Sequence, residues 1–168
     1  MSTWLHLLNE IKRRPPEHYL TVSQRAVRDQ IVDWLRYPQW VNLYGKPGAG
    51  KTFVAWSLVR AIGALHISLP SSLKGLVNPP DIVLIDNAPY SESDVRRIFS
   101  TCELLSIPSV VLLTRQPVRM PIKSVELPLP TPDDLVVVTR SLGLLNYPCK
   151  KSLLPGVPNF WDVLQACI

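Results

Sequence analysis

Residues 40–52 read Trp-Val-Asn-Leu-Tyr-Gly-Lys-Pro-Gly-Ala-Gly-Lys-Thr and contain the pattern G-x-x-x-x-G-K-[ST] without a gap or a substitution. The residues before the first glycine are mostly apolar or β-prone, as in a buried strand, and residues 53–62 have the apolar spacing of a helix. The glycines therefore lie at a predicted turn from strand to helix. This is the context that a phosphate-binding loop requires.

The chemistry of phosphate binding explains the spacing of this motif. Glycines let the backbone approach a ligand closely and turn successive N–H groups towards phosphate oxygens, and the helix that follows adds its positive end. Lys51 is placed to reach the β- and γ-phosphates, and the Thr52 hydroxyl to ligate Mg²⁺. We expect the nucleotide to be bound by the whole loop, which consists of Gly45, Lys46, Pro47, Gly48, Ala49, Gly50, Lys51 and Thr52.

A second apolar run carries an acid at its end. Residues 81–87 read Asp-Ile-Val-Leu-Ile-Asp-Asn, which is typical of a buried parallel strand that delivers a carboxylate at its C-terminal end. In a phosphate-loop protein, this is where an acid holds Mg²⁺ through its water shell. We therefore expect Asp86 to share the metal with Thr52. The alternative is that Asp86 only begins a turn before Asn87.

The rest of the chain predicts an α/β fold. Apolar runs predict three more strands, at residues 64–68, 109–114 and 124–127. Apolar spacing and capping residues predict further helices at residues 2–14, 23–35, 91–105, 133–142 and 160–168, the second of them capped by Ser23. The link at residues 69–75 is too short for a full helix. We expect a five-stranded parallel sheet with helices on both faces, followed by two short helices.

Three parts of the chain follow from this order of elements. We expect N-terminal helices at residues 1–38, a nucleotide-binding core at residues 39–128 and a helical part at residues 129–168. Residues 19–21 lead into the core and are expected beside the adenine of a bound nucleotide.

The composition indicates a soluble protein. Hydrophobic residues make up 46% of the 168 residues, and no apolar run approaches the length of a membrane span. The N-terminus has no basic leader and no small-residue cleavage site, so we expect a cytoplasmic protein without membrane contact. The three cysteines include no C-x-x-C pair, and the three histidines are scattered. We expect reduced thiols and no metal other than Mg²⁺.

The formal net charge is +5, and part of it is clustered at residues 12–14, at Arg25 and Arg28, and at Arg96 and Arg97. Such clusters suit DNA or an acidic protein as a partner. A solvated basic face is an equally good interpretation.

With these motifs in order, the chain resembles the AAA+ branch of phosphate-loop ATPases, in particular the compact members that act on DNA, such as replication initiators, helicase loaders and clamp-loader subunits. Residues 45–52 match Walker A, residues 82–86 match Walker B, and Thr114 matches the polar end of the sensor 1 strand. The resemblance covers nearly the whole chain. It implies that residues 129–168 form an abbreviated helical lid, that ATP and Mg²⁺ are cofactors, and that the protein works in a homo-oligomer or another protein assembly.

In such assemblies a subunit commonly completes its neighbour's site with an arginine. Arg115, Arg119 and Arg140 are the candidates that the resemblance implies. A surface charge or a salt bridge is the alternative for each of them.

Two positions depart from the family pattern. Asn87 stands where the family has its catalytic Glu, and an amide can orient water but cannot accept its proton. Asn159 stands where the resemblance places the sensor 2 arginine. Together with the short lid, these departures predict slow hydrolysis.

Three functions therefore stay open. The first is an ATP-binding AAA+-like protein, a slow ATPase with Lys51, Asp86, Asn87, Thr114 and Arg115 at its catalytic site, which acts as a nucleotide-dependent switch in a DNA- or protein-remodelling assembly. The second is a regulatory or adaptor module that binds nucleotide without hydrolysing it. The third is a small phosphotransferase. The chain has no N-K-x-D motif for reading guanine, which favours ATP.

Overall fold

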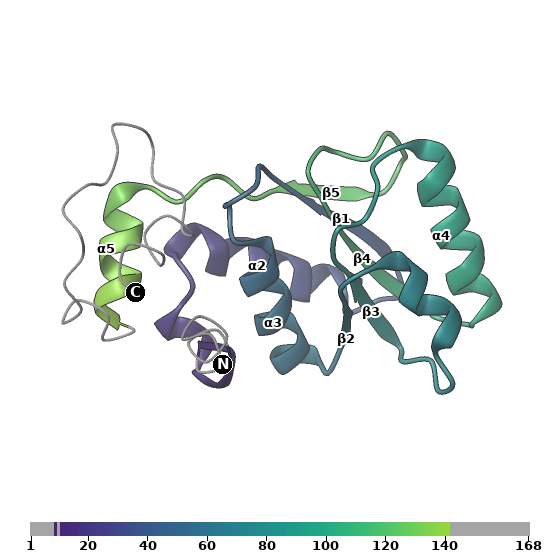
Figure 1. Ribbon diagram of the computed structural model, residues 1–168, viewed down its shortest axis with the longest axis horizontal. Helices are drawn as coiled ribbons and strands as arrows, with labels where there is room; N and C mark the ends of the chain where they lie inside the picture. The colour runs from purple at the N-terminus through teal and green to yellow at the C-terminus, as the bar shows by residue number, and fades with distance from the viewer. Residues whose placement is uncertain (1–8, 10, 142–168) are drawn as a thin grey trace.

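The computed structural model describes residue 9 and residues 11–141. The expected helix at residues 160–168, the position of Asn159 and most of the expected helix at residues 2–14 lie outside the described residues. Figure 1 shows the arrangement of the elements, which in chain order are η1 (Pro16–His18), α2 (Val22–Trp34), β1 (Trp40–Tyr44), α3 (Lys51–Ile62), β2 (Leu65–Ile67), η2 (Pro70–Gly75), β3 (Ile82–Ile85), α4 (Glu92–Leu104), β4 (Ser109–Thr114), β5 (Lys123–Glu126) and α5 (Pro132–Ser141).

All five strands form one parallel sheet in the order β2-β3-β4-β1-β5. Helices α2 and α3 cover one face of this sheet, and α4 and the 3₁₀ helix η2 lie against the other (Figure 1). Every residue of β4 is buried, as befits a central strand that is covered on both faces. The prediction of a five-stranded parallel sheet with helices on both faces is confirmed.

The position of β4 organises the functional edge of the sheet. It pairs with β1 on one side and with β3 on the other, so the carboxyl ends of the three strands lie next to one another. The chain leaves β1 towards β2 at one edge of the sheet, but it returns after β4 to place β5 on the far side of β1. Ligands of open α/β sheets bind where the strand order reverses in this way.

Helix α2 begins earlier than the sequence suggested. Its N-cap is Thr21 and not Ser23, because Thr21 Oγ1 accepts a hydrogen bond from Gln24 N at 3.2 Å and Gln24 Oε1 accepts one from Thr21 N at 3.0 Å. This reciprocal capping box satisfies two backbone donors, whereas a lone Ser23 cap would satisfy one.

The C-terminal helix α5 lies at the end of the molecule away from α4 and beside the N-terminal segment (Figure 1). Its Val138 is buried, and Ser141 Oγ lies 3.3 Å from His18 Nδ1. The division into three parts at residues 38 and 128 stays a prediction. Within the described part of the chain, no helix is long and apolar enough to cross a bilayer.

Candidate functional site

The loop between β1 and α3 is shaped by its glycines. Gly50 is the N-cap of α3 and has a φ of 90°, a left-handed conformation that glycine adopts readily and residues with a Cβ atom rarely adopt. At Gly45 an added Cβ would lie 2.5 Å from the backbone oxygen of Leu127, so the close approach of two chain segments requires glycine there. The motif residues thus form a tight turn that opens directly into a helix.

Gln24 fixes the back of this loop, although the sequence predictions did not include this residue. The side chain of Gln24 is buried, and its Nε2 donates a hydrogen bond of 2.8 Å to the carbonyl oxygen of Ala49. A Cβ on Gly50 would collide with the same Nε2 atom. One buried amide therefore joins the first turn of α2 to the phosphate-binding loop. The pattern T-x-x-Q at residues 21–24 was the available signal, as a capping box.

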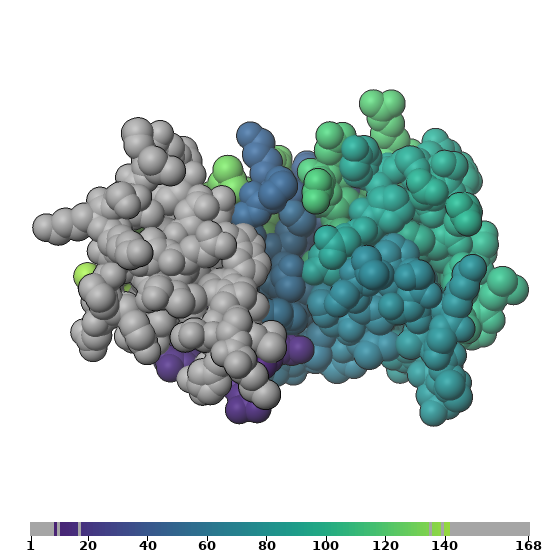
Figure 2. Space-filling view, viewed as in Figure 1, coloured from purple at the N-terminus to yellow at the C-terminus, as the bar shows by residue number. Residues whose placement is uncertain are grey.

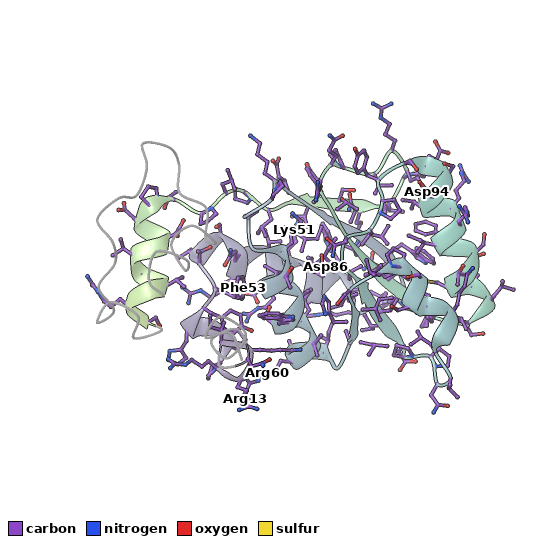
Figure 3. All side chains as sticks on the ribbon, viewed as in Figure 1. Arg13, Lys51, Phe53, Arg60, Asp86 and Asp94 are labelled. Carbon is purple, nitrogen blue, oxygen red and sulfur yellow. The ribbon has the colours of Figure 1, made fainter. Side chains whose placement is uncertain are left out.

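Lys51 folds back over the loop. Its Nζ donates hydrogen bonds of 2.6 Å to the Gly45 oxygen and 3.1 Å to the Lys46 oxygen. Burial lowers the pKa of Lys51 from its ordinary value, the charge of Asp86 acts against this, and the charge of Arg115 adds to it. Lys51 and Asp86 lie close together at the carboxyl end of the strands (Figure 3). The structure thus places a partly desolvated cation inside the loop.

Thr52 and Asp86 meet as the sequence predicted for a shared metal. Thr52 Oγ1 donates a hydrogen bond of 2.8 Å to Asp86 Oδ2, and the backbone N–H of Asn87 donates one of 2.8 Å to Asp86 Oδ1. Burial raises the pKa of Asp86, but the nearby His66 imidazole, the Thr52 hydroxyl and the Asn87 amide outweigh it, so the net pKa is below the ordinary value. Asp86 is therefore a carboxylate at neutral pH.

This donor set fits Mg²⁺. A hydroxyl and a carboxylate are hard oxygen ligands, and Mg²⁺ is usually held by one or two protein groups together with water and substrate phosphates. No group of three or more His, Cys, Asp or Glu side chains that could hold a metal ion occurs among the described residues. Thr52 and Asp86 would thus leave the other coordination positions of Mg²⁺ to water and phosphate oxygens.

Asn87 holds the turn that follows β3. Its φ is 51°, a left-handed conformation that asparagine tolerates better than most residues. Its Nδ2 donates a hydrogen bond of 3.2 Å to the Ser68 oxygen, beyond the end of β2. The side chain is exposed at the wall of the pocket described below.

Thr114 is part of a buried network. Its Oγ1 accepts a hydrogen bond of 2.7 Å from Asn42 Nδ2 and donates one of 2.6 Å to the Gln116 oxygen. Asn42 Oδ1 accepts a further hydrogen bond of 2.9 Å from Val118 N. The hydroxyl proton of Thr114 is therefore used within the turn after β4. The same turn carries the exposed side chain of Arg115 to the wall of the pocket.

These groups surround one pocket of about 450 Å³ at the carboxyl ends of β1, β3 and β4. This volume lies in the usual range for small-molecule sites. Its wall contains Pro47, Gly48, Gly50, Lys51, Thr52, Phe53, Asp86, Asn87, Ala88, Pro89, Tyr90, Leu113, Thr114 and Arg115. In the space-filling view, residues of η2 and α4 cover much of the right-hand part of the visible face (Figure 2).

Some predicted site residues lie outside this wall. Gly45 and Lys46 contribute the carbonyl oxygens that hold Lys51, and Ala49 is buried against Gln24. Residues 19–21, which we expected beside an adenine, are buried and do not line the pocket. The candidate arginines Arg119 and Arg140 do not line it either. Tyr90, which no motif indicated, does.

Comparison with known proteins bears on the fold. No protein-family model matches the sequence, and no curated protein matches it. A crystal structure of a DNA replication initiation factor is similar, with a TM-score of 0.54 over 78% of this chain and 14% sequence identity. This chain covers 54% of the length of that protein. At this identity the likeness shows a shared fold and nothing more.

Proposed function

We propose that this protein binds ATP with Mg²⁺ and acts as a nucleotide-dependent switch in a DNA- or protein-remodelling assembly. The observation that carries the proposal is the hydrogen bond of 2.8 Å between Thr52 Oγ1 and Asp86 Oδ2. Both residues lie in the pocket wall together with Lys51 and the glycine-rich loop. Two residues that are 34 positions apart in sequence thus meet at the carboxyl ends of the strands, where open α/β sheets bind their ligands, and this supports their role as a metal pair.

Each group has a distinct part in binding. The backbone N–H groups of the loop and the N-terminus of α3 hold the phosphates. When nucleotide binds, Lys51 Nζ gives up its hydrogen bonds to the carbonyl oxygens of Gly45 and Lys46 and donates to oxygens of the β- and γ-phosphates instead. Thr52 and Asp86 hold Mg²⁺, which when bound neutralises charge on the phosphate oxygens.

Hydrolysis in this proposal is slow. Asn87 occupies the position beside the metal pair, and its amide cannot take a proton from water. Its Nδ2 already donates to the Ser68 oxygen, and the Thr114 proton already goes to the Gln116 oxygen. Two groups that would order the attacking water and the γ-phosphate are therefore engaged within the protein.

Slow hydrolysis of ATP suits a switch whose catalytic site is completed by another molecule. Arg115 lies in the wall of its own pocket, so it can serve the nucleotide bound to the same subunit. Arg119 and Arg140 lie outside the wall and are the candidates for a neighbouring subunit's pocket. The similarity to a replication initiation factor favours DNA and a homo-oligomer as the partners to test first.

A non-hydrolysing adaptor is the second candidate. The same two engaged groups, Asn87 and Thr114, favour it. The adaptor differs from the switch in one respect. It would retain ATP without hydrolysing it, even in the presence of DNA or at high protein concentration.

The proposal is tested by equilibrium binding of ATP to the purified chain and to Lys51→Ala. We expect the substitution to weaken binding by about tenfold or more, since a charge-assisted hydrogen bond contributes roughly 1.5–3 kcal/mol. Lys74→Ala is the matched control, because Lys74 is exposed on η2 and lies outside the pocket wall. Absence of saturable ATP binding, or equal binding by both variants, would overturn the proposal.

A further inference from the structure

His66 carries a buried atom that lacks a hydrogen-bond partner. It is the middle residue of β2, and its side chain is 15% exposed. Among the described residues, its Nε2 is the sole buried side-chain nitrogen or oxygen without a hydrogen bond. Leaving such a group unsatisfied costs about 1–3 kcal/mol, so it needs an explanation.

The unpartnered atom faces the metal pair. Nε2 lies 3.5 Å from Asp86 Oδ2, the same oxygen that accepts the hydrogen bond from Thr52. This separation is a few tenths of an ångström longer than an ordinary N–H···O hydrogen bond. The backbone places the two residues side by side, since β2 pairs with β3 through His66↔Leu84 and Asp86 N donates to the Ile67 oxygen at 2.9 Å.

His66 reaches Asp86 from outside the pocket. It does not belong to the pocket wall, whereas Asp86 and Thr52 do. It therefore cannot take a proton from a water molecule in the pocket, and it acts on the site only through the carboxylate that it faces. Carboxylates that bind a metal are in turn hydrogen-bonded by neighbouring groups, and such partners fix the orientation of the ligand.

We propose that His66 is a positioning residue, which orients Asp86 for Mg²⁺ by donating the hydrogen bond from Nε2 that the structure leaves unmade. Closing the 3.5 Å separation satisfies Nε2 and fixes one oxygen of the carboxylate. Binding of Mg²⁺ with the nucleotide then favours formation of this hydrogen bond, and the hydrogen bond in turn increases the affinity for Mg²⁺. The inference rests on the proposed function and adds to it a residue that controls the magnesium-dependent part of the affinity.

The test measures ATP binding in Mg²⁺ and in EDTA, together with the Mg²⁺ concentration that gives half-maximal ATP binding. For His66→Leu we expect binding in Mg²⁺ to weaken by about tenfold, the lower end of the usual effect of losing such a partner, and binding in EDTA to be unchanged. His66→Gln keeps an N–H donor and should recover most of the affinity. His18→Leu, which removes a histidine remote from the pocket, should change neither.

A double-mutant cycle with Asp86→Asn separates positioning from a structural effect. In the Asp86→Asn background, His66→Leu should cause no further loss of Mg²⁺ dependence, because the carboxylate that it orients is gone. If His66→Leu does not fold, His66→Asn replaces it, since its shorter side chain cannot reach Asp86. Equal losses in Mg²⁺ and EDTA, or an unchanged Mg²⁺ midpoint, would overturn this inference. Absence of ATP binding by the unmodified protein would instead overturn the proposed function.

Discussion

Asn42 shows what a single residue adds to this site. It is fully buried in the middle of β1, yet it is polar, and its Nδ2 donates to Thr114 Oγ1 while its Oδ1 accepts from Val118 N. Strand propensity gives no reason for an amide at this position. The reason is non-local, because Asn42 fixes the turn that carries Arg115, 73 residues later in the chain.

The site residues that a sequence can indicate are those whose expected role is local. Lys51 and Thr52 belong to one contiguous motif, and Asp86 ends an unbroken apolar strand, so spacing alone predicts them. Gln24 contacts Ala49 and His66 contacts Asp86, each across a separation in sequence that no pattern marks, although T-x-x-Q predicts the capping box of Gln24 itself. They became visible only when the strand order placed β2 beside β3 and α2 behind the loop.

Asn87→Glu tests the residue that limits hydrolysis. We expect the turnover of ATP to rise by about a hundredfold or more, the usual contribution of a general base, since a carboxylate can accept the proton of water. The φ of 51° will make the variant less stable by about 1 kcal/mol. Phosphate release in a single turnover is the measurement. Asn87→Gly, which removes the amide without adding a base, should leave hydrolysis slow, and an equal rate increase in both variants would contradict the account.

At the scale of elements, the capping and apolar patterns explain where the predictions held. The predicted strand at residues 109–114 is β4, and the expected start of a helix near Ser91 is confirmed by its N-cap role before α4. Helix α5 begins at Pro132, one residue before the predicted start. Thr131 and Asp134 form the capping box there, with hydrogen bonds of 3.1 Å and 3.0 Å. The error at Ser23 arose because two adjacent cap candidates compete, and only the partner at N3 decides between them.

Gln24→Ala tests the connection between α2 and the loop. The substitution removes the hydrogen bond to the Ala49 oxygen and half of the capping box, so we expect the free energy of unfolding to fall by about 2 kcal/mol. ATP affinity should fall as well, because the loop loses its rear support. Urea denaturation and ATP titration give the two values. Gln30→Ala, an exposed glutamine on the same helix, is the control, and the same small effect at both positions would refute the role assigned to Gln24.

Cys102 tests the packing of α4 on the sheet. Burial, with a smaller contribution from Glu103, raises the pKa of its thiol from 9.0 to about 11. The folded state therefore holds this proton more tightly, and the stability that this group contributes falls as the pH rises from about 9 to about 11. In a Cys149→Ser, Cys167→Ser background at pH 8, a thiol reagent should label the chain slowly in buffer and rapidly in urea. Rapid labelling in buffer would show that α4 does not seal this face.

At the scale of the whole molecule, the N-terminal segment and the phosphate-binding loop are joined through α3. Arg60 on this helix donates hydrogen bonds of 3.1 Å and 2.7 Å to the carbonyl oxygens of Arg13 and Arg14, and Lys12 Nζ lies 5.5 Å from the centre of the Trp56 ring. Figure 3 shows Arg13 and Arg60 together at the end of α3 remote from Lys51. The basic cluster is thus carried by the helix that begins at the nucleotide site.

DNA binding through this cluster predicts a steep dependence on salt. We expect Lys12→Gln combined with Arg13→Gln to weaken retention on duplex DNA and to reduce the slope of log K against log salt by about two, if each of the two cations neutralises one phosphate. Arg96→Gln combined with Arg97→Gln removes the same charge from α4 and should have little effect. Retention that does not depend on salt, or an equal loss for both pairs, would remove DNA from the account.

The most direct measurement takes ATP retention and phosphate formation from the same samples of the purified chain, at rising protein concentration, with Mg²⁺ present. We predict that one ATP is retained per chain and that phosphate forms slowly, at a rate far below the roughly 10 s⁻¹ of a typical enzyme. A rate per chain that increases with protein concentration would show that a neighbouring subunit completes the site. Failure to retain ATP at any protein concentration would contradict the central claim, namely that Lys51, Thr52 and Asp86 form a site for ATP and Mg²⁺.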